Sequence, residues 1–312
     1  MPLSLRRGTV TAIVERHDEL VRLQVDGTAC IAYPRVTGPV EVGDDVVVNV
    51  QARELALGSG GFDVLHANLT RGLGLEPEPG AHVMTLPYTS LQHAARHGEE
   101  DALAESLAGT PVVCCSLHSQ VVPVCAALRG VEVAYVQVGG GALPVSLSDA
   151  LRALRARRLL AFTVAAAPCI DADVQAVNVY SALAYAVAAG ADVVVCAIGP
   201  GIVGTGTALG HGGLAAAQAV DAAAALGGRA VLAPRVSAGD ARPRHRGLSH
   251  HTEAVLRVCL AIPLVPEALE PECWREECAG LPLSHMGRGP DDDPEFFAAA
   301  FAAGRLARSL LT

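Results

Sequence analysis

Between residues 111 and 260, short apolar runs alternate with longer helix-like segments, and this alternation constrains the fold more than any other feature of the chain. The apolar runs are residues 111–116, 131–136, 159–165, 191–198 and 229–234. A run of the V-V-V-C-A type is apolar on both faces, as a strand must be when helices cover both sides of its sheet. The alternation therefore predicts an α/β fold with a largely parallel, doubly wound, Rossmann-like sheet.

The segments between these runs have the length and composition of helices. We expect helices at residues 118–128, 146–157, 173–189, 211–226 and 250–260, followed by a terminal amphipathic helix at 295–311. Asp291-Asp292-Asp293-Pro294 is typical of a helix start, which places the beginning of the terminal helix. Aromatic residues make up only 4% of the chain, so the core must be built from Ala, Val and Leu.

The first 70 residues or so have a different pattern. Short alternating runs at 8–14, 20–25, 29–33 and 45–51 are separated by turn signals such as Asp26-Gly27. They predict a small antiparallel β-barrel of the SH3-like or OB-like kind. Residues 73–80, with Pro77 and Pro79, resemble a linker, which gives a barrel domain at 1–75 and an α/β domain at 83–312. We expect the barrel to make few contacts with any ligand pocket.

The composition argues against several classes of protein. A formal net charge of -9 and few aromatic residues disfavour general nucleic-acid binding, which needs a basic face and stacking platforms. No uninterrupted apolar stretch of about 18 residues is present, so we expect no membrane partner. No signal peptide is recognisable, and the nine cysteines match no zinc ribbon. We therefore expect a cytoplasmic protein with reduced, mostly structural cysteines, and a homo-oligomer, namely a dimer.

Positive charge is concentrated in residues 235–252. This segment contains the basic side chains Arg235, Arg242, Arg244, His245, Arg246, His250 and His251, and a single carboxylate, Asp240. Pro243 favours an extended conformation, in which Arg242, Arg244 and Arg246 would point to one side. Ser249 can cap a helix that begins at His250. Guanidinium groups beside free helix N–H groups indicate a site for a phosphate or carboxylate; the alternative is a solvated basic loop.

A second candidate is the glycine loop, residues 199–213, in which seven of fifteen residues are glycine. It joins a predicted strand to a helix, and Gly204, Thr205, Gly206 and Thr207 offer backbone amides and hydroxyls to an anion. It lacks the lysine of a P-loop and fits a dinucleotide fingerprint poorly, so an oxidoreductase is disfavoured. The alternative is a set of tight packing turns. We expect it to lie beside the loop at 235–249, on the carboxyl edge of the sheet.

Further candidate residues lie outside these two loops. His118 and Asn178 are expected to contact the ligand, and the glycines at 139–141 fit either a ligand contact or a simple turn. The adjacent His118 and Ser119 fit either a nucleophilic pair or a helix cap with polar pocket lining.

The residues that could hold a metal are His211, His250, His251, Asp173 and Asp240. Adjacent histidines on a helix diverge by about 100°, so we expect no metal site.

Five short motifs together resemble a bacterial family of unknown function, one of the numbered domain-of-unknown-function groups. They are G-P-G-I-V-G-T-G-T, R-H-R-G-L-S-H-H-T, A-V-N-V-Y-S-A-L, L-H-S-Q and G-G-A-L-P. The resemblance spans about residues 84–260 and extends to the barrel as well. It implies no particular activity. This chain departs from the family pattern by having Gly139 before G-G-A-L-P, and Asp171, Ala172, Asp173 and Gln175 before A-V-N-V-Y. Two acid–base carboxylates of the pattern are thus missing.

These features predict a protein that binds a small phosphorylated or carboxylated metabolite. If it is an enzyme, hydrolysis or group transfer on a phosphorylated small molecule fits best. His250 or His251 would be the general acid or base, with Asp173 or Asp240 as the orienting carboxylate and arginines stabilising charge. The alternative is a non-catalytic module for metabolite sensing or assembly, which the two missing carboxylates favour. The sequence identifies no cofactor.

Overall fold

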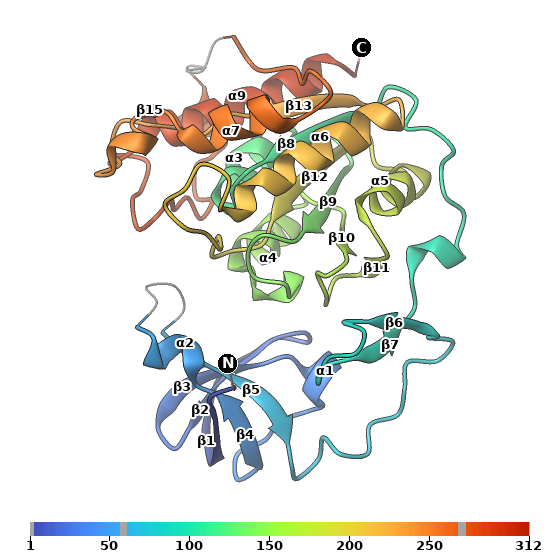
Figure 1. Cartoon of the computed structure of the whole chain (residues 1–312), viewed down its shortest axis with the longest axis vertical. Coiled ribbons are helices and arrows are strands. Elements are labelled where there is room, and N and C mark those ends of the chain that lie inside the picture. Colours follow the sequence, from blue (N-terminus) through green and yellow to red (C-terminus); the bar gives the residue numbers. More distant parts are fainter. Residues whose placement is uncertain (1–2, 57–60, 268–272, 312) are drawn as a thin grey trace. The chain divides into compact units, whose positions relative to one another are not determined.

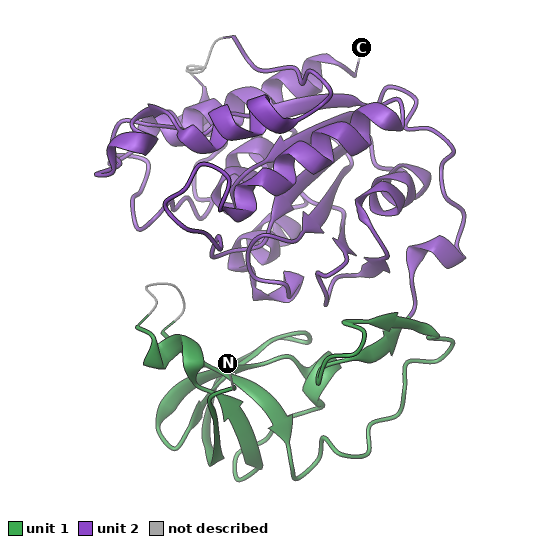
Figure 2. Cartoon of the chain, in the orientation of Figure 1, with its two compact units in different colours: residues 1–95 green, residues 96–312 purple. Residues whose placement is uncertain are grey.

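The computed structural model describes residues 3–56, 61–267 and 273–311. The chain forms two compact units, residues 1–95 and 96–312 (Figure 2). None of the described helices is long and apolar enough to cross a membrane.

The first unit contains a closed five-stranded barrel. In barrel order its strands are β1 (Leu5–Arg16), β2 (Val21–Val25), β3 (Thr28–Ala32), β5 (Asp63–Asn68) and β4 (Asp45–Asn49). Alternate side chains such as Val21, Leu23 and Val25 point into the barrel, as period-two strands require. The predicted barrel is confirmed, with one exception to its antiparallel pairing, because β3 and β5 are parallel. Five strands closed in this way match the OB type.

Short elements complete the first unit. They are the helices α1 (Pro34–Thr37) and α2 (Gln51–Glu54) and the hairpin of β6 (Val83–Thr85) and β7 (His93–Ala95).

The second unit is built on a six-stranded sheet. Its strands are β8 (Pro111–Cys115), β9 (Val133–Val138), β10 (Phe162–Ala166), β11 (Val174–Ala176), β12 (Val193–Ile198) and β13 (Arg229–Ala233). All pairs are parallel, in the order β11-β10-β9-β12-β8-β13. This arrangement confirms the predicted α/β class and is consistent with a Rossmann-like fold.

Helices cover both faces of this sheet (Figure 1). One face carries α5 (Val179–Ala188), α6 (Ala215–Ala225) and α7 (His250–Val258), and the other α3 (Val121–Ala127), α4 (Asp149–Ala156), α8 (Trp274–Glu277) and α9 (Pro294–Ser309). Small side chains allow close packing: a Cβ at Gly304 of α9 would lie 2.5 Å from the carbonyl oxygen of Val124 in α3. The Ala-rich core expected from the low aromatic content therefore brings helices close together.

The predicted helix at 173–189 is wrong in its first half. The Asp173 carboxylate accepts hydrogen bonds from the Thr163 backbone N–H and hydroxyl at 2.8 and 2.9 Å, which aligns β11 beside β10. The helix α5 starts only after Asn178, whose side chain accepts from the N–H groups of Tyr180 and Ser181 at 2.9 and 3.1 Å. The polar side chains of Asp173 and Asn178 thus divide one apolar stretch into a strand and a helix.

Two glycine-rich loops at the carboxyl ends of β9 and β12 pack backbone against backbone. A Cβ at Gly212 would lie 1.9 Å from the Gly140 carbonyl oxygen, and one at Gly141 would lie 2.2 Å from that of Gly199. The Val203 N–H also donates to the Gly140 carbonyl at 2.9 Å. These glycines are therefore required by close packing. The packing-turn interpretation holds for this part of the glycine loop.

Candidate functional site

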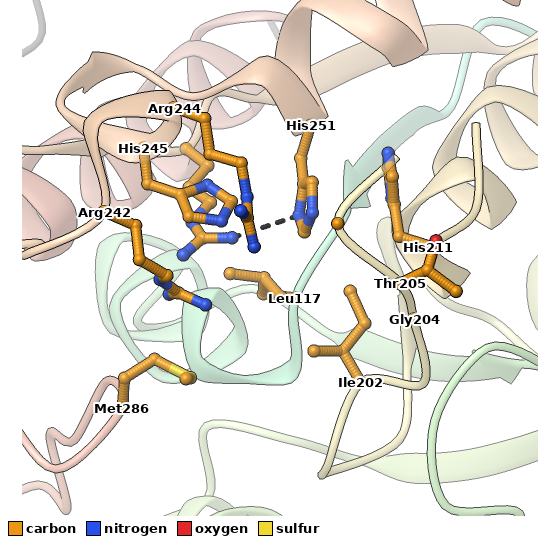
Figure 3. Close-up of a pocket in the computed structure, with 12 residues that line it drawn as sticks. Leu117, Ile202, Gly204, Thr205, His211, Arg242, Arg244, His245, His251 and Met286 are labelled. Atoms are coloured by element: carbon orange, nitrogen blue, oxygen red, sulfur yellow. Dashed lines mark hydrogen bonds between the residues drawn. The ribbon is translucent and has the colours of Figure 1, made fainter. Parts of the chain in front are cut away.

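A cavity of about 340 Å³ lies at the carboxyl ends of β8, β12 and β13 (Figure 3). Its lining residues are Leu117, Ile202, Gly204, Thr205, Gly206, His211, Arg235, Arg242, Arg244, His245, His251 and Met286. All twelve belong to the second unit. Residues of the glycine loop and of the loop at 235–249 face the same space, so the prediction that these two loops lie side by side is confirmed. We call this cavity the pocket.

The glycine loop forms one wall of the pocket through a small turn. Gly204 and His211 pair as an isolated antiparallel bridge, and the Thr205 N–H donates to the Gly210 carbonyl at 2.6 Å. The hydroxyls of Thr205 and Thr207 are 2.9 Å apart. Of the four predicted ligand residues here, Gly204, Thr205 and Gly206 line the pocket, while Thr207 supports Thr205 from outside the lining.

The arginine–histidine loop, residues 235–249, is closed at its base by β14 (Val236–Ser237) and β15 (Gly247–Leu248). Pro243 begins a 3-10 turn that extends to His245, so the segment is not extended. The expectation that three arginines point to one side is therefore wrong. Arg242 and Arg244 line the pocket, but Arg246 turns back and donates through Nε to the Asp240 carbonyl at 2.9 Å.

The helix α7 begins as the sequence predicts. Ser249 is its N-cap, and the hydroxyl accepts a hydrogen bond from the His251 N–H at 3.2 Å. The same hydroxyl lies 2.7 Å from His245 Nδ1, so the cap also positions a histidine that lines the pocket.

Asp240 is the centre of an ion-pair cluster behind the pocket. Its carboxylate, 2% exposed, accepts from Arg242 at 2.8 and 2.9 Å and from Arg235 and Arg288 at 3.3 Å each. The hydrogen bond from Arg242 is the main cause that holds the pKa of Asp240 well below its usual range. Its lone pairs are taken by guanidinium groups, and no hydrogen bond joins it to a described histidine. We therefore correct the expected role of Asp240 from orienting a catalytic histidine to positioning arginines.

Arg235 is buried, with 2% of its surface exposed. One terminal nitrogen donates to His251 Nδ1 at 3.0 Å. Burial lowers the pKa of Arg235 to about 10, which leaves the guanidinium charged at neutral pH. A guanidinium can only donate, so His251 Nδ1 is the acceptor and a neutral His251 carries its proton on Nε2.

Two members of the ion-pair cluster come from the C-terminal segment and were missed in the sequence. Arg288 donates through Nε to Asp293 at 3.0 Å, and the Ser237 hydroxyl donates to the same carboxylate at 2.7 Å. Asp293 does precede the first residue of α9, as the helix-start signal indicates, but its side chain makes no cap hydrogen bond. Neither residue lies near the arginine–histidine loop in sequence, so no local pattern reports the pairing.

The histidines around the pocket are held in the neutral form. Burial, followed by the charge of Arg235, lowers the pKa of His245 to about 3, and burial followed by His211 lowers that of His251 to about 2. Burial is also the main cause that lowers the pKa values of His211 and His250. Neutral imidazoles among charged guanidiniums can donate to an anion and accept a proton during chemistry.

Three histidines lie closer together than the sequence indicates. One ring nitrogen from each of His211, His250 and His251 falls within 4.8 Å of the others. The expected divergence of the adjacent His250 and His251 is wrong, since their ring centroids are 4.5 Å apart. Helix geometry separates the Cα–Cβ directions, whereas rotation within each side chain brings the rings back together.

This cluster does not have the electrostatics of a cation site. The His211 ring stacks on His251 with centroids 3.8 Å apart and planes at 16°, so their in-plane lone pairs do not converge on one ion. Arg235 occupies Nδ1 of His251, and no carboxylate lines the pocket beside its three arginines. The absence of a bound metal stays a prediction.

Besides Thr207, Arg246 and Asp240, four further predicted site residues lie outside the pocket lining. His118 is hydrogen-bonded through Nε2 to the Ser148 hydroxyl at 2.6 Å, and Ser119 contacts His285 instead, at 3.2 Å, so His118 and Ser119 form no pair. Asp173 is paired with Arg155 at the amino end of β11, opposite the strand ends that form the pocket. Asn178 serves as the cap of α5. His250 belongs to the histidine cluster but is not a lining residue either.

Comparison with known proteins gives the chain a family. No curated protein matches the sequence. Residues 29–272 match the family described as "Protein of unknown function (DUF3866)". The match covers well over half of the chain, including part of the barrel and both loops of the pocket. The chain therefore belongs to the DUF3866 family.

Proposed function

We propose that the pocket binds a small anionic metabolite, whose phosphate or carboxylate group is held between Arg244 and the glycine loop. The observation that carries this proposal is the charge of the lining, which contains three arginines and no carboxylate. Gly206 faces Arg244, since a Cβ built on it would lie 3.7 Å from the guanidinium. Backbone amides opposite a guanidinium fork are a favourable setting for phosphate or carboxylate oxygens.

The charge balance of the surrounding cluster supports an anion. Four guanidinium groups, those of Arg235, Arg242, Arg244 and Arg288, are gathered around only two carboxylates, Asp240 and Asp293. Arg244 has no hydrogen-bond or ion-pair partner within the described part of the chain. The four positive charges exceed the two negative charges by two, which matches the charge of a phosphate monoester near neutral pH.

Arg244→Ala is expected to weaken binding of the anion by on the order of 1–3 kcal/mol, because a charge-assisted hydrogen bond is lost. Arg244→Lys should also weaken it, since a point charge replaces a planar fork. Calorimetric titration with inorganic phosphate and with phosphorylated metabolites from a thermal-shift screen measures both effects. Binding to the wild type should also weaken as the salt concentration rises.

Arg257→Ala is the matched control for this experiment. Arg257 is an exposed arginine on α7 that does not line the pocket, so its loss should leave affinity unchanged. Equal affinity of the folded Arg244→Ala variant and the wild type would contradict the proposal and return the segment to a solvated basic loop.

A second candidate function, hydrolysis or group transfer on the bound anion, is favoured by His211. This residue lines the pocket, is 7% exposed, and neither ring nitrogen makes a hydrogen bond of good geometry within the described residues. A neutral imidazole with a free nitrogen is a suitable general base. The role predicted for His250 or His251 fits His211 better, because Arg235 already occupies Nδ1 of His251.

Hydrolysis of p-nitrophenyl phosphate and a panel of phosphate monoesters tests this candidate. His211→Asn should lower kcat by about 10²–10⁴-fold while inorganic phosphate still binds. Turnover that survives in the variant would exclude His211 as the base. Phosphate binding without any turnover by the wild type would overturn the enzymatic candidate in favour of a metabolite sensor.

A further inference from the structure

The wall of the pocket has an apolar part. Leu117, Ile202 and Met286 all line the pocket, and Figure 3 shows them in the lower part of the view, with Leu117 between the other two. Leu117 is buried at the end of β8, and Ile202 comes from the glycine loop. The pocket thus offers cationic groups to one end of a ligand and aliphatic side chains to the rest of it.

Met286 is presented by an unusual turn. His285 and Arg288 pair through two backbone hydrogen bonds of 2.9 Å, which leaves Met286 and Gly287 as the tip, with φ of 52° and 79°. Two positive φ values favour Asn-Gly in such a turn, and a methionine in the left-handed region is strained. Strain at a residue that lines a pocket points to a role for its side chain there.

Both flanks of this turn are fixed to the rest of the second unit. The His285 ring stacks on Phe296 at 3.7 Å, and Arg288 is bound to Asp293 and Asp240. The turn therefore holds Met286 at the pocket although 58% of this side chain is exposed. A flexible, polarisable thioether at such a place adapts to apolar groups of varied shape.

We infer that the ligand is a compact amphiphilic anion: a phosphate or carboxylate head on a short aliphatic body that packs against Met286, Leu117 and Ile202. This inference rests on the proposed function and specifies its ligand. Apart from the neutral histidines, Thr205 supplies the only uncharged polar side chain of the lining, so several hydroxyls of a sugar would lose hydrogen bonds to water without full replacement. No Phe, Tyr or Trp is present in the lining to stack on a nucleobase.

The test compares ligands that share a head and differ in the body. Calorimetry with inorganic phosphate and with methyl, propyl and pentyl phosphate should show affinity rising about fourfold per methylene, the equivalent of about 0.8 kcal/mol, until the cavity is filled. Propyl phosphate should bind at least tenfold more tightly than glycerol phosphate. Acetate, butanoate and hexanoate form a parallel series that shows which head is preferred.

Met286→Asn separates recognition from folding. Asparagine suits a positive φ, so the variant should keep or raise the melting temperature. It should lose the gain with chain length while inorganic phosphate binds as before. The control is Met84→Asn, in the hairpin of the first unit, which should change neither the affinity for inorganic phosphate nor the gain in affinity with chain length.

The outcomes distinguish this inference from the proposed function. Two outcomes would contradict the inference of an aliphatic body without affecting the proposed anion site. One is equal affinity for propyl phosphate and glycerol phosphate, and the other is a gain in affinity with chain length that persists in Met286→Asn. If neither series nor inorganic phosphate binds the folded protein, the anion site fails and this inference fails with it.

Discussion

Asp240→Asn is expected to lower the free energy of unfolding of the second unit by about 3–5 kcal/mol, because it leaves buried positive charge without its partner. Three guanidinium groups share this one carboxylate, and Arg235 beside it is fully buried. The neutral amide cannot offset their charge, and its NH₂ group would face donors. Affinity for the anion should fall as well, since Arg235 and Arg242 lose the contact that positions them.

Urea denaturation followed by tryptophan fluorescence measures this loss. The single tryptophan, Trp274, is buried in the core of the second unit, so its fluorescence reports unfolding of that unit alone. Asp291→Asn is the control: this carboxylate also pairs with an arginine but is 94% exposed, and its loss should cost less than about 1 kcal/mol. Equal stability of Asp240→Asn and the control would show that the cluster does not depend on its central carboxylate.

Acidification from pH 7 to pH 5 is expected to destabilise the second unit by about 2 kcal/mol for each histidine that is buried in the neutral form. Burial lowers the pKa of His245 and His285 to about 3 and that of His251 to about 2, against about 6.5 in the unfolded chain. Below pH 6.5 the unfolded chain therefore binds more protons than the folded unit. The stability is complete above pH 6.5 and is lost progressively as the pH falls toward 3.

Melting temperatures between pH 7 and pH 5 test this dependence, because most carboxylates remain ionised in that range. His251→Asn is the informative variant, since its side-chain oxygen can still accept from Arg235 but does not titrate. Between pH 7 and pH 5 this variant should lose about 2 kcal/mol less stability than the wild type, because it has one titrating histidine fewer. A wild type whose stability is flat from pH 7 to pH 5 would contradict neutral burial of these rings. Saturating phosphate should reduce the loss, since a bound anion favours protonated imidazoles.

The sequence predicts those parts of the molecule in which one periodicity repeats over several residues. The apolar runs predict the parallel strands, and the rule that ligands bind at carboxyl ends selects both loops of the pocket. It also selects His118, which instead hydrogen-bonds to Ser148, while Asn178, inside a predicted helix, caps the later start of α5. A polar residue after a strand has two uses, capping a helix or binding a ligand, and spacing alone does not distinguish them.

The remaining features of the pocket depend on contacts between distant segments. Met286, Arg288 and Asp293 come from a stretch with no strand or helix periodicity, about fifty residues after the loop that they support. The sequence pattern assigns His211 only to a candidate metal site, although its place near the end of the glycine loop, at a helix start, is a usable signal for a pocket residue. Asp173 is far from the pocket because β11, which follows it, lies at the far edge of the sheet. The order of strands in a sheet cannot be read from local sequence patterns.

The two glycine-rich loops pack backbone against backbone, so a residue can be shared within this family for either of two reasons: it is required for packing, or it binds the ligand. Gly140, Gly141, Gly199 and Gly212 have no room for a Cβ, so they should be glycine in relatives that bind quite different molecules. Arg244 and Met286 line the pocket, and relatives with another ligand should differ there together. Glycines shared at these four positions therefore reflect common ancestry and the requirements of folding. Substitutions at Arg244 and Met286 would instead indicate a change of ligand.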